Sequence, residues 1–321
     1  MKKALLHIIF VLSVVVVFGQ DFHYSQFNYA PTNINPALAG HFDGKYRIHL
    51  NSRNQWRSFS SPFRTNGIAF DMDSLGKFPI SPMIGIYSDK AGDAKYGMIQ
   101  INLGLAYKLT IKNHLFSPGI QFSLNNTNFN LEDLMFDRYG NADIIGGNQT
   151  SSSYNKINAG ITWTYYFSKK IIFHNGFSLY NMFQQETGII SNFRNQQRFN
   201  FHGEAQIKSF GTFDLIPAYL VSYLANERNI TAGSEIKVPM IIDKYYLKAV
   251  HASVFYRYGN AVILETGLNF NQVRIGLSYD LNVHSLNDNL VSGGGFEFSL
   301  RWIKPHKDRP VPFFRKCKDY L

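Results

Sequence analysis

The sequence contains little that could cross-link it or carry it through a membrane as a helix. Its 321 residues include one cysteine, Cys317, so no intramolecular disulfide can form. Beyond the first twenty residues, polar or charged side chains interrupt every apolar run within about ten positions, which excludes a helical membrane span. Charged residues make up only 17% of the chain and aromatic residues 16%. This balance still permits a membrane protein whose strands alternate apolar and polar side chains.

Motifs that mark catalytic or cofactor sites are also missing. The sequence has no Gly-x-Ser-x-Gly elbow, no His-Glu-x-x-His helix and no Cys-x-x-Cys pair. The run Gly293–Gly295 precedes an expected strand, whereas a phosphate-binding loop follows a strand and opens a helix. We therefore expect no enzyme activity, no cofactor, no metal site and no nucleic-acid binding. A lipid hydrolase would need a Ser-His pair that is assembled in space without a linear motif.

The first nineteen residues have the organisation of a secretory signal peptide. Met1–Lys3 is positively charged, and Ala4–Phe18 is apolar except for His7 and Ser13. Cleavage is expected near Gly19 or Gln20, so residues 1–19 would be removed. The alternative is an uncleaved anchor, but the apolar run is shorter than the ~20 residues that normally span a bilayer.

Alternation with a period of two dominates the rest of the chain. The clearest case is 99–109, where Ile99, Ile101 and Leu103 alternate with polar or small residues over a length that can cross a membrane as a tilted strand. A helix would scatter these side chains around its surface. With the weaker cases, about fourteen strands are expected, at 46–51, 68–72, 82–88, 99–109, 120–124, 157–167, 173–179, 199–207, 213–224, 230–236, 250–258, 262–270, 273–281 and 296–302.

An even number of such strands in an exported chain predicts an all-β fold, a closed transmembrane antiparallel β-barrel of the outer membrane, over residues 43–304. Aromatic residues crowd the expected strand ends, as girdles at the two membrane interfaces would. A soluble β-sandwich or propeller is the competing interpretation, but no repeat of blade length is visible. The polar segment 125–153 is expected to be a long extracellular loop.

Two segments lie outside the strand pattern. Residues 20–42 are rich in Asn, Pro, Ala and aromatics, and we expect them to fold into or against the periplasmic mouth of the barrel. Residues 305–321 form a basic tail that could contact acidic partners or lipid headgroups, or simply be solvated. Basic residues on the expected lumen face could favour anions in a pore or pair with acidic ones; they are Arg47, Lys108, Arg274 and Arg301, with Glu204, Glu265, Asp280 and Glu297 as possible partners.

Ordered motifs at both ends carry a family resemblance. The segment after the signal peptide reads Gln-Asp-Phe-His-Tyr-Ser-Gln-Phe from Gln20, then Asn-Pro-Ala-Leu-Ala-Gly from Asn35 and Arg-Asn-Gln-Trp-Arg from Arg53. Near the other end, Ser-Tyr-Asp at 278–280 and Ser-Gly-Gly-Gly-Phe-Glu-Phe-Ser-Leu at 292–300 precede the basic tail. This series closely resembles the PorP/SprF family of type IX secretion system outer-membrane proteins of the Bacteroidota. The tail departs from the Cys-Pro-Arg-Phe-like ending of many members.

The resemblance implies a non-enzymatic barrel associated with secretion or surface attachment of large proteins that bear type IX sorting domains, including gliding adhesins. Its expected partners are such a secreted protein, other type IX components and outer-membrane lipid. A passive porin or a channel for hydrophobic substrates is the alternative function. Residues expected to bind a partner or plug the lumen are Asn35, Pro36, Gly40, Arg53, Gln55, Trp56 and Arg57. Trp56 could equally be an interface anchor, with the two arginines paired to acidic groups.

Overall fold

The computed structural model describes residues 23–55, 63–91, 96–128, 151–186, 194–208, 213–225, 227–240, 247–283 and 294–306. It contains fifteen strands and three short helical turns within these ranges. The strands are β1 (Tyr46–Gln55), β2 (Phe63–Met72), β3 (Ile80–Ala91), β4 (Tyr96–Tyr107), β5 (Leu109–Ile111), β6 (His114–Asn128), β7 (Ser151–Tyr166), β8 (Ile171–Tyr180), β9 (Arg198–Lys208), β10 (Asp214–Leu224), β11 (Glu227–Pro239), β12 (Leu247–Arg257), β13 (Ala261–Phe270), β14 (Val273–Asn282) and β15 (Gly295–Lys304).

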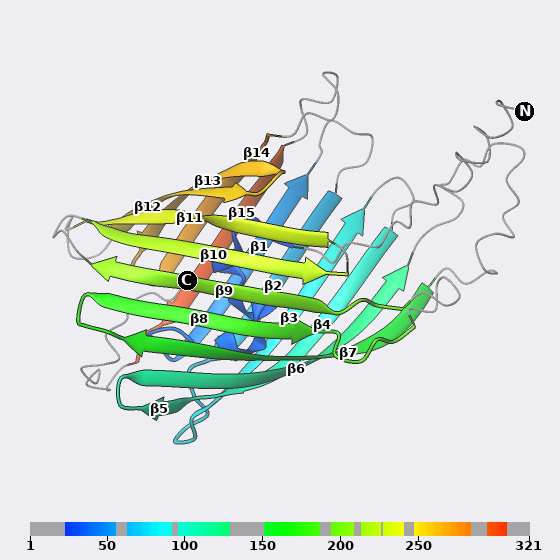
Figure 1. The fold of residues 1–321 in the computed structure, drawn as a ribbon, viewed down its shortest axis with the longest axis horizontal. Coiled ribbons are helices and arrows are strands. Elements are labelled where there is room, and N and C mark those ends of the chain that lie inside the picture. Colours follow the sequence, from blue (N-terminus) through cyan, green and yellow to red (C-terminus); the bar gives the residue numbers. More distant parts are fainter. Residues whose placement is uncertain are drawn as a thin grey trace, which may run out of the picture.

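The strands form one closed antiparallel barrel (Figure 1). Strands that are neighbours in the sequence pair with each other, except β4 and β5; in addition, β1 pairs with β15 and β4 pairs with β6. The short strand β5 continues β4 after Lys108 and pairs with β6 in the same register, Leu109 opposite Phe116. The barrel therefore has fourteen strands with one interrupted by a single residue, which confirms the predicted fold and strand number. All fourteen predicted segments overlap an observed strand, although β6 and β7 extend into the expected loop 125–153.

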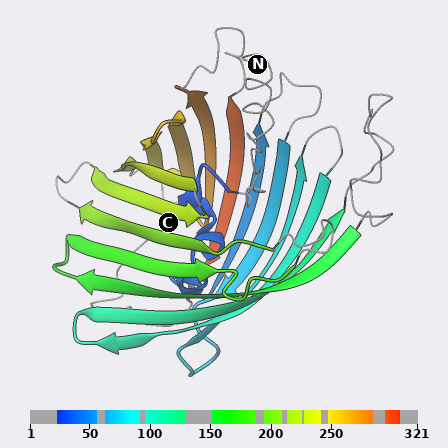
Figure 2. The ribbon, with the colours of Figure 1, turned by 45° about the vertical axis from the view of Figure 1, so that its right-hand side comes forward.

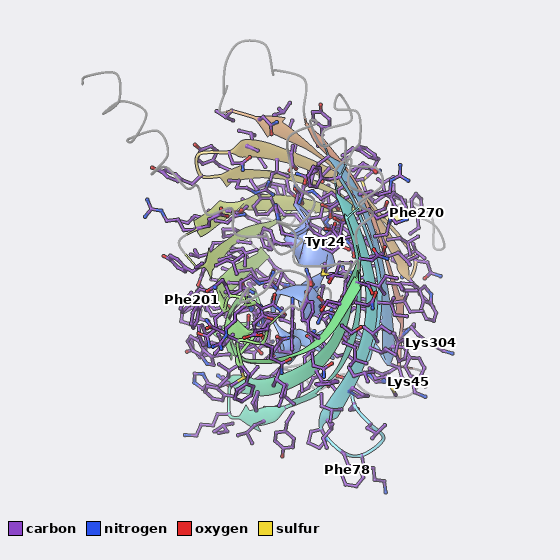
Figure 3. The ribbon with its side chains drawn as sticks, turned by 90° about the vertical axis from the view of Figure 1, so that its right-hand side faces the viewer. Tyr24, Lys45, Phe78, Phe201, Phe270 and Lys304 are labelled. Carbon is purple, nitrogen blue, oxygen red and sulfur yellow. The ribbon has the colours of Figure 1, made fainter. Side chains whose placement is uncertain are left out.

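Alternation places apolar side chains outside and polar side chains inside. In β4, Ile99, Leu103 and Leu105 are about half exposed, whereas Gln100 and Asn102 are buried. Figure 3 shows the same arrangement for Phe201 and Phe270, which point away from the barrel. The exposed apolar band suits lipid, since the sheet is closed and leaves no unpaired strand edge inside it. No helix in the described ranges is long and apolar enough to cross a membrane.

The interior of the barrel is occupied by the chain before β1, which we call the luminal segment, His23–Phe42. Figure 2 shows it in dark blue within the ring of strands. It folds into three short turns, η1 (Phe27–Tyr29), α2 (Pro31–Ile34) and η2 (Pro36–Leu38). Prolines open α2 and η2, where their missing N–H groups cost no helical hydrogen bond. The segment is buried almost throughout, so it forms part of the interior packing of the barrel.

The two ends of the barrel differ in their connections. At one end the strands are joined by short turns such as 112–113, 167–170 and 271–272, and this end also holds Lys45 and Lys304 beside the first and last strands. The other end carries the connections 129–150, 181–197 and 283–294, which are longer than any at the first end. We call these the turn end and the loop end. In Figure 3, Lys45, Lys304 and Phe78 lie toward the turn end, below Tyr24.

Candidate functional site

Asn35 fixes the middle of the luminal segment to the barrel wall. Its side chain is fully buried, and its Nδ2 donates to the backbone carbonyls of Ile161 at 3.2 Å and Phe177 at 3.1 Å. The same Nδ2 lies 3.0 Å from His202 Nε2. Its Oδ1 accepts from the backbone N–H of Ala37 at 2.9 Å, which caps η2. One amide side chain therefore joins the segment to three neighbouring strands, β7, β8 and β9.

Wall glycines allow this close approach. A Cβ at Gly119 of β6 would lie 2.5 Å from the backbone nitrogen of Ala37, and a Cβ at Gly160 of β7 would collide with Oδ1 of Asn35. Glycine lets a backbone or polar side chain approach to a distance that no other residue tolerates. Adjacent strands thus present a flat surface on which the turn Asn35–Pro36–Ala37 rests.

An ion-pair cluster holds the last part of the segment at the turn end. Arg47 of β1 is fully buried, and its Nε and Nη2 donate to the two oxygens of Asp71 at 3.0 and 2.8 Å. The same guanidinium donates to the carbonyls of Leu38 at 3.0 Å and His41 at 3.1 Å. Asp71 Oδ2 in turn accepts from the N–H of Gly40 at 2.7 Å. The two strand charges neutralise each other and bind three backbone groups of the segment.

Gly40 is required at its position by its conformation. Its φ is +73°, in the left-handed region, and a Cβ there would meet Ser81 and the carbonyl of Met72. Lys108, the residue that interrupts β4 and β5, donates to the carbonyl of Gly40 and pairs with Asp73. The break between these strands therefore brings an ammonium group to the segment where it leaves the lumen.

A second charged cluster holds the beginning of the segment near the loop end. Arg53 of β1 donates to the carbonyl of His23 and pairs with Asp280 of β14 at 3.0 Å. Ser25 donates its hydroxyl to Asp280 at 2.6 Å, and its N–H donates to Glu297 of β15 at 2.7 Å. These acidic side chains lie close to the start of β15 and the end of β14, beside the connection 283–294.

Tyr29 ties the first turn to the wall between these two clusters. Its hydroxyl accepts from Nε of Arg274 at 2.6 Å, and its ring lies 4.7 Å from the guanidinium carbon of Arg274. Arg274 also pairs with Glu235 at 2.7 Å, and Glu235 contacts His251 at 2.6 Å. Tyr29 therefore binds Arg274 in two ways, by cation–π attraction to its ring and by a hydrogen bond to its hydroxyl.

His41 lies among cationic groups. Its Nε2 is 2.9 Å from Ser117 Oγ, and its ring centroid is 5.4 Å from that of His174. Burial lowers the pKa of His41 well below its ordinary value, and nearby His174, Lys108 and Arg47 act in the same direction. The imidazole is therefore neutral at pH 7, which avoids an unpaired buried charge.

One cavity beside the luminal segment, among the described residues, is small. Its volume of about 20 Å³ has room for a water molecule or two. It is lined by Asn28, Glu204, Gln206, Ile216, Ala218, Glu235, Lys237, Phe255 and Arg274. Within the described ranges no three His, Cys, Asp or Glu side chains are grouped so that they could hold a metal ion.

Four of the seven expected site residues take part in contacts between the luminal segment and the barrel wall or belong to that segment. Asn35, Pro36 and Gly40 lie in the luminal segment, and Arg53 binds its first described residue. Gln55, the last residue of β1, is half-buried opposite Gly295. Trp56 and Arg57 lie outside the described residues, as do the basic tail from 307 onward and Cys317.

The pairing of lumen charges differs from the expected set. Arg47, Lys108 and Arg274 are paired, but with Asp71, Asp73 and Glu235, none of which was among the four expected acidic partners. Asp280 does pair, with Arg53 and Arg257. The expected acids Glu204 and Glu265 form no ion pair among the described residues. Alternation identified the lumen face correctly, whereas partners depend on how neighbouring strands are aligned.

The luminal segment extends farther than the sequence predicted. It was expected at the periplasmic mouth, and Gly40 does lie at the turn end, but Ser25 lies near the other end of the barrel. No periodicity marked its contacts. The signals that could have indicated them are the lumen glycines Gly119 and Gly160 and the buried polar run from Ser25.

Solved structures with the same barrel fold include two toluene transporters and a monoaromatic hydrocarbon channel. The toluene transporter TbuX of Ralstonia pickettii is 9% identical, with a TM-score of 0.53 over 87% of this chain and 94% of that one. The monoaromatic hydrocarbon channel CymD is 9% identical, with a TM-score of 0.54 over 91% and 96%. The P. putida toluene transporter TodX is 7% identical, with a TM-score of 0.51 over 86% and 93%. At such low identity the likeness shows the fold alone.

The sequence comparisons identify the family. No curated protein matches the chain in sequence. The profile described as "Type IX secretion system membrane protein PorP/SprF" matches residues 16–302, which include the luminal segment and every strand up to the last residues of β15. The barrel fold, its apolar outer band and this match place the protein in the outer membrane. The chain therefore belongs to the PorP/SprF family of type IX secretion system membrane proteins.

Proposed function

We propose that this barrel serves type IX secretion as a binding component for large proteins that bear C-terminal sorting domains, and that it does not conduct them through its lumen. The observation that carries the proposal is the occupied interior. Asn35 binds the barrel wall from the middle of the luminal segment, and Arg47 and Arg53 of β1 bind its two ends. A secreted chain could use this lumen only after all three attachments were broken.

The free energy of those attachments supports a permanently filled lumen. Separating the segment from Arg47 and Asp71 would break three hydrogen bonds between these charged side chains and the backbone of the segment, and a hydrogen bond to a charged group typically contributes about 1.5–3 kcal/mol. The cluster of Arg53, Asp280 and Glu297 adds a second cost of the same kind. Partner binding would then fall to the surfaces outside the lumen.

The proposed partners follow from the family and the fold. They are a secreted sorting-domain protein, other type IX components, and outer-membrane lipid around the apolar band that includes Ile99, Leu103 and Phe201. Gliding adhesins would be among the secreted proteins. We assign the protein no catalytic reaction, because the sequence lacks the motifs of catalytic sites and the family is one of secretion membrane proteins.

Deletion of the gene tests the proposal in the source organism. One or a few large sorting-domain proteins should remain inside the cell or be lost from the cell surface, as measured by proteomics of intact cells, culture medium and periplasm. Re-expression of the full chain should restore them, and an unrelated outer-membrane barrel serves as the control. Unchanged secretion and attachment of every sorting-domain protein would refute the proposal.

A channel for hydrophobic or other small substrates is the second candidate. It is favoured by the fold shared with the toluene transporter TbuX and the hydrocarbon channel CymD. The small cavity next to Glu204 and Arg274 is bordered by charged groups and has room for little more than water, which disfavours it. Growth on aromatic hydrocarbons, or their uptake into vesicles, should therefore be the same with and without the protein.

A further inference from the structure

Contacts along a single strand give the direction of the luminal segment. Arg47, the second residue of β1, binds the carbonyls of Leu38 and His41, whereas Arg53 near the end of β1 binds the carbonyl of His23. Arg53 is six positions along the strand from Arg47, which corresponds to about 20 Å at ~3.3 Å per residue. The first and last residues of the segment are therefore held at well-separated heights in the barrel.

Other strands agree with β1. Ser25 binds Asp280 and Glu297, which lie near the loop end of β14 and β15. Gly40 binds Asp71, the last residue but one of β2, at the turn end. Figure 3 likewise shows Tyr24 above Lys45 and Lys304, on the side toward the loop end. The chain thus passes lengthwise through the lumen, with His23 toward the loop end.

The lengths of the connections indicate which end of the barrel faces the outside of the cell. Outer-membrane barrels have short turns on the periplasmic side and longer loops outside the cell. Here the longer connections 129–150, 181–197 and 283–294 are at the end where His23 lies. We propose that the luminal segment begins, at His23, at the extracellular mouth of the barrel, so that the amino terminus of the mature protein lies on the cell-surface side.

The arrangement has a consequence for assembly. A chain whose signal peptide stayed in the inner membrane would keep its start on the periplasmic side, which is incompatible with His23 near the extracellular mouth. Cleavage of the signal peptide must then precede closure of the seam between β1 and β15, the first and last strands of the ring.

Cysteine labelling in intact cells tests the position of the terminus. Cys317 is first removed by Cys317→Ser, and single cysteines are introduced by Asp21→Cys, by Asn260→Cys at the loop end and by Lys77→Cys at the turn end. Asn260 and Lys77 are both exposed, so they are matched controls for the two sides. Each variant is treated with a membrane-impermeant maleimide before and after permeabilisation, and labelling in SDS gives the total.

The expected result is that the Asp21→Cys and Asn260→Cys variants react in intact cells. Labelling of the Lys77→Cys variant should be low in intact cells and at least tenfold higher after permeabilisation. An Asp21→Cys variant that follows the Lys77→Cys pattern overturns the proposal. So does one that reacts in SDS alone, since the terminus would then be enclosed. Reaction of the Lys77→Cys variant and not the Asn260→Cys variant in intact cells would reverse the barrel and equally overturn it.

Discussion

Replacing Asn35 by alanine should loosen the luminal segment without unfolding the barrel. The substitution removes the donors to the carbonyls of Ile161 and Phe177 and the acceptor for the N–H of Ala37. At a net value of about 1 kcal/mol for each of three bonds, the attachment should weaken by about 3 kcal/mol. Since 1.4 kcal/mol is a factor of ten, local opening should become on the order of a hundredfold more frequent.

Hydrogen exchange with mass spectrometry measures this opening in detergent-solubilised protein. Peptides that cover residues 35–42 should exchange about a hundredfold faster in the Asn35→Ala variant, while peptides from β4 should be unchanged. Asn35→Asp should be worse, because a carboxylate would face two carbonyl oxygens. Asn126→Ala is the matched control, since Asn126 bonds Ser153 on the outer surface at 2.9 Å. Equal protection of residues 35–42 in the variant and the native protein would refute the reasoning.

Three further perturbations test other contacts. Gly119→Ala adds a methyl group that would collide with the backbone of the luminal segment, so the free energy of unfolding, measured with urea by gel shift, should fall by about 1–3 kcal/mol. Ala252→Val on the lipid face is the control and should change the free energy of unfolding little. Equal losses in the two variants would contradict the close approach at Gly119. Arg47→Met leaves Asp71 buried without its cation and should cost about 3–5 kcal/mol in the same assay, and a neutral outcome would show that the pair is not needed. Because the pKa of His41 is lowered, neutral His41 stabilises the packed luminal segment fully above pH ~6.5, and this stabilisation declines as the pH falls. Acid should therefore increase conductance in planar bilayers, and His41→Gln should reduce that increase. An identical pH profile in both proteins would exclude His41 as the cause.

The strands could be predicted because their signal is local. Alternation in segments such as 99–109 is visible without knowledge of any partner strand, and closure of the ring needs only an even number of strands. The strand ends were less certain: β6 continues to Asn128 and β7 starts at Ser151, since polar residues can pair in a sheet beyond the membrane. The fold followed from composition and period together.

The site was only partly predictable, because its contacts join residues far apart in the sequence. Motif residues Asn35, Gly40 and Arg53 were expected to bind a partner or plug the lumen; the structure shows them at lumen contacts, but the residues that they contact were not predicted. Asp71 meets Arg47 only because β2 aligns with β1 in one register, and a shift of one residue would turn its side chain to the lipid. Irregular segments such as 23–42 have no period from which a path can be inferred.

Conductance of the purified protein in planar bilayers tests most directly whether the barrel is closed by its own chain. The native protein should stay largely closed, and a variant that lacks residues 23–42 should conduct steadily if it inserts as a folded, heat-modifiable barrel. That difference is what an interior filled by the luminal segment predicts. Steady conductance of the native protein, equal to that of the deletion variant, would contradict it and favour a passive channel.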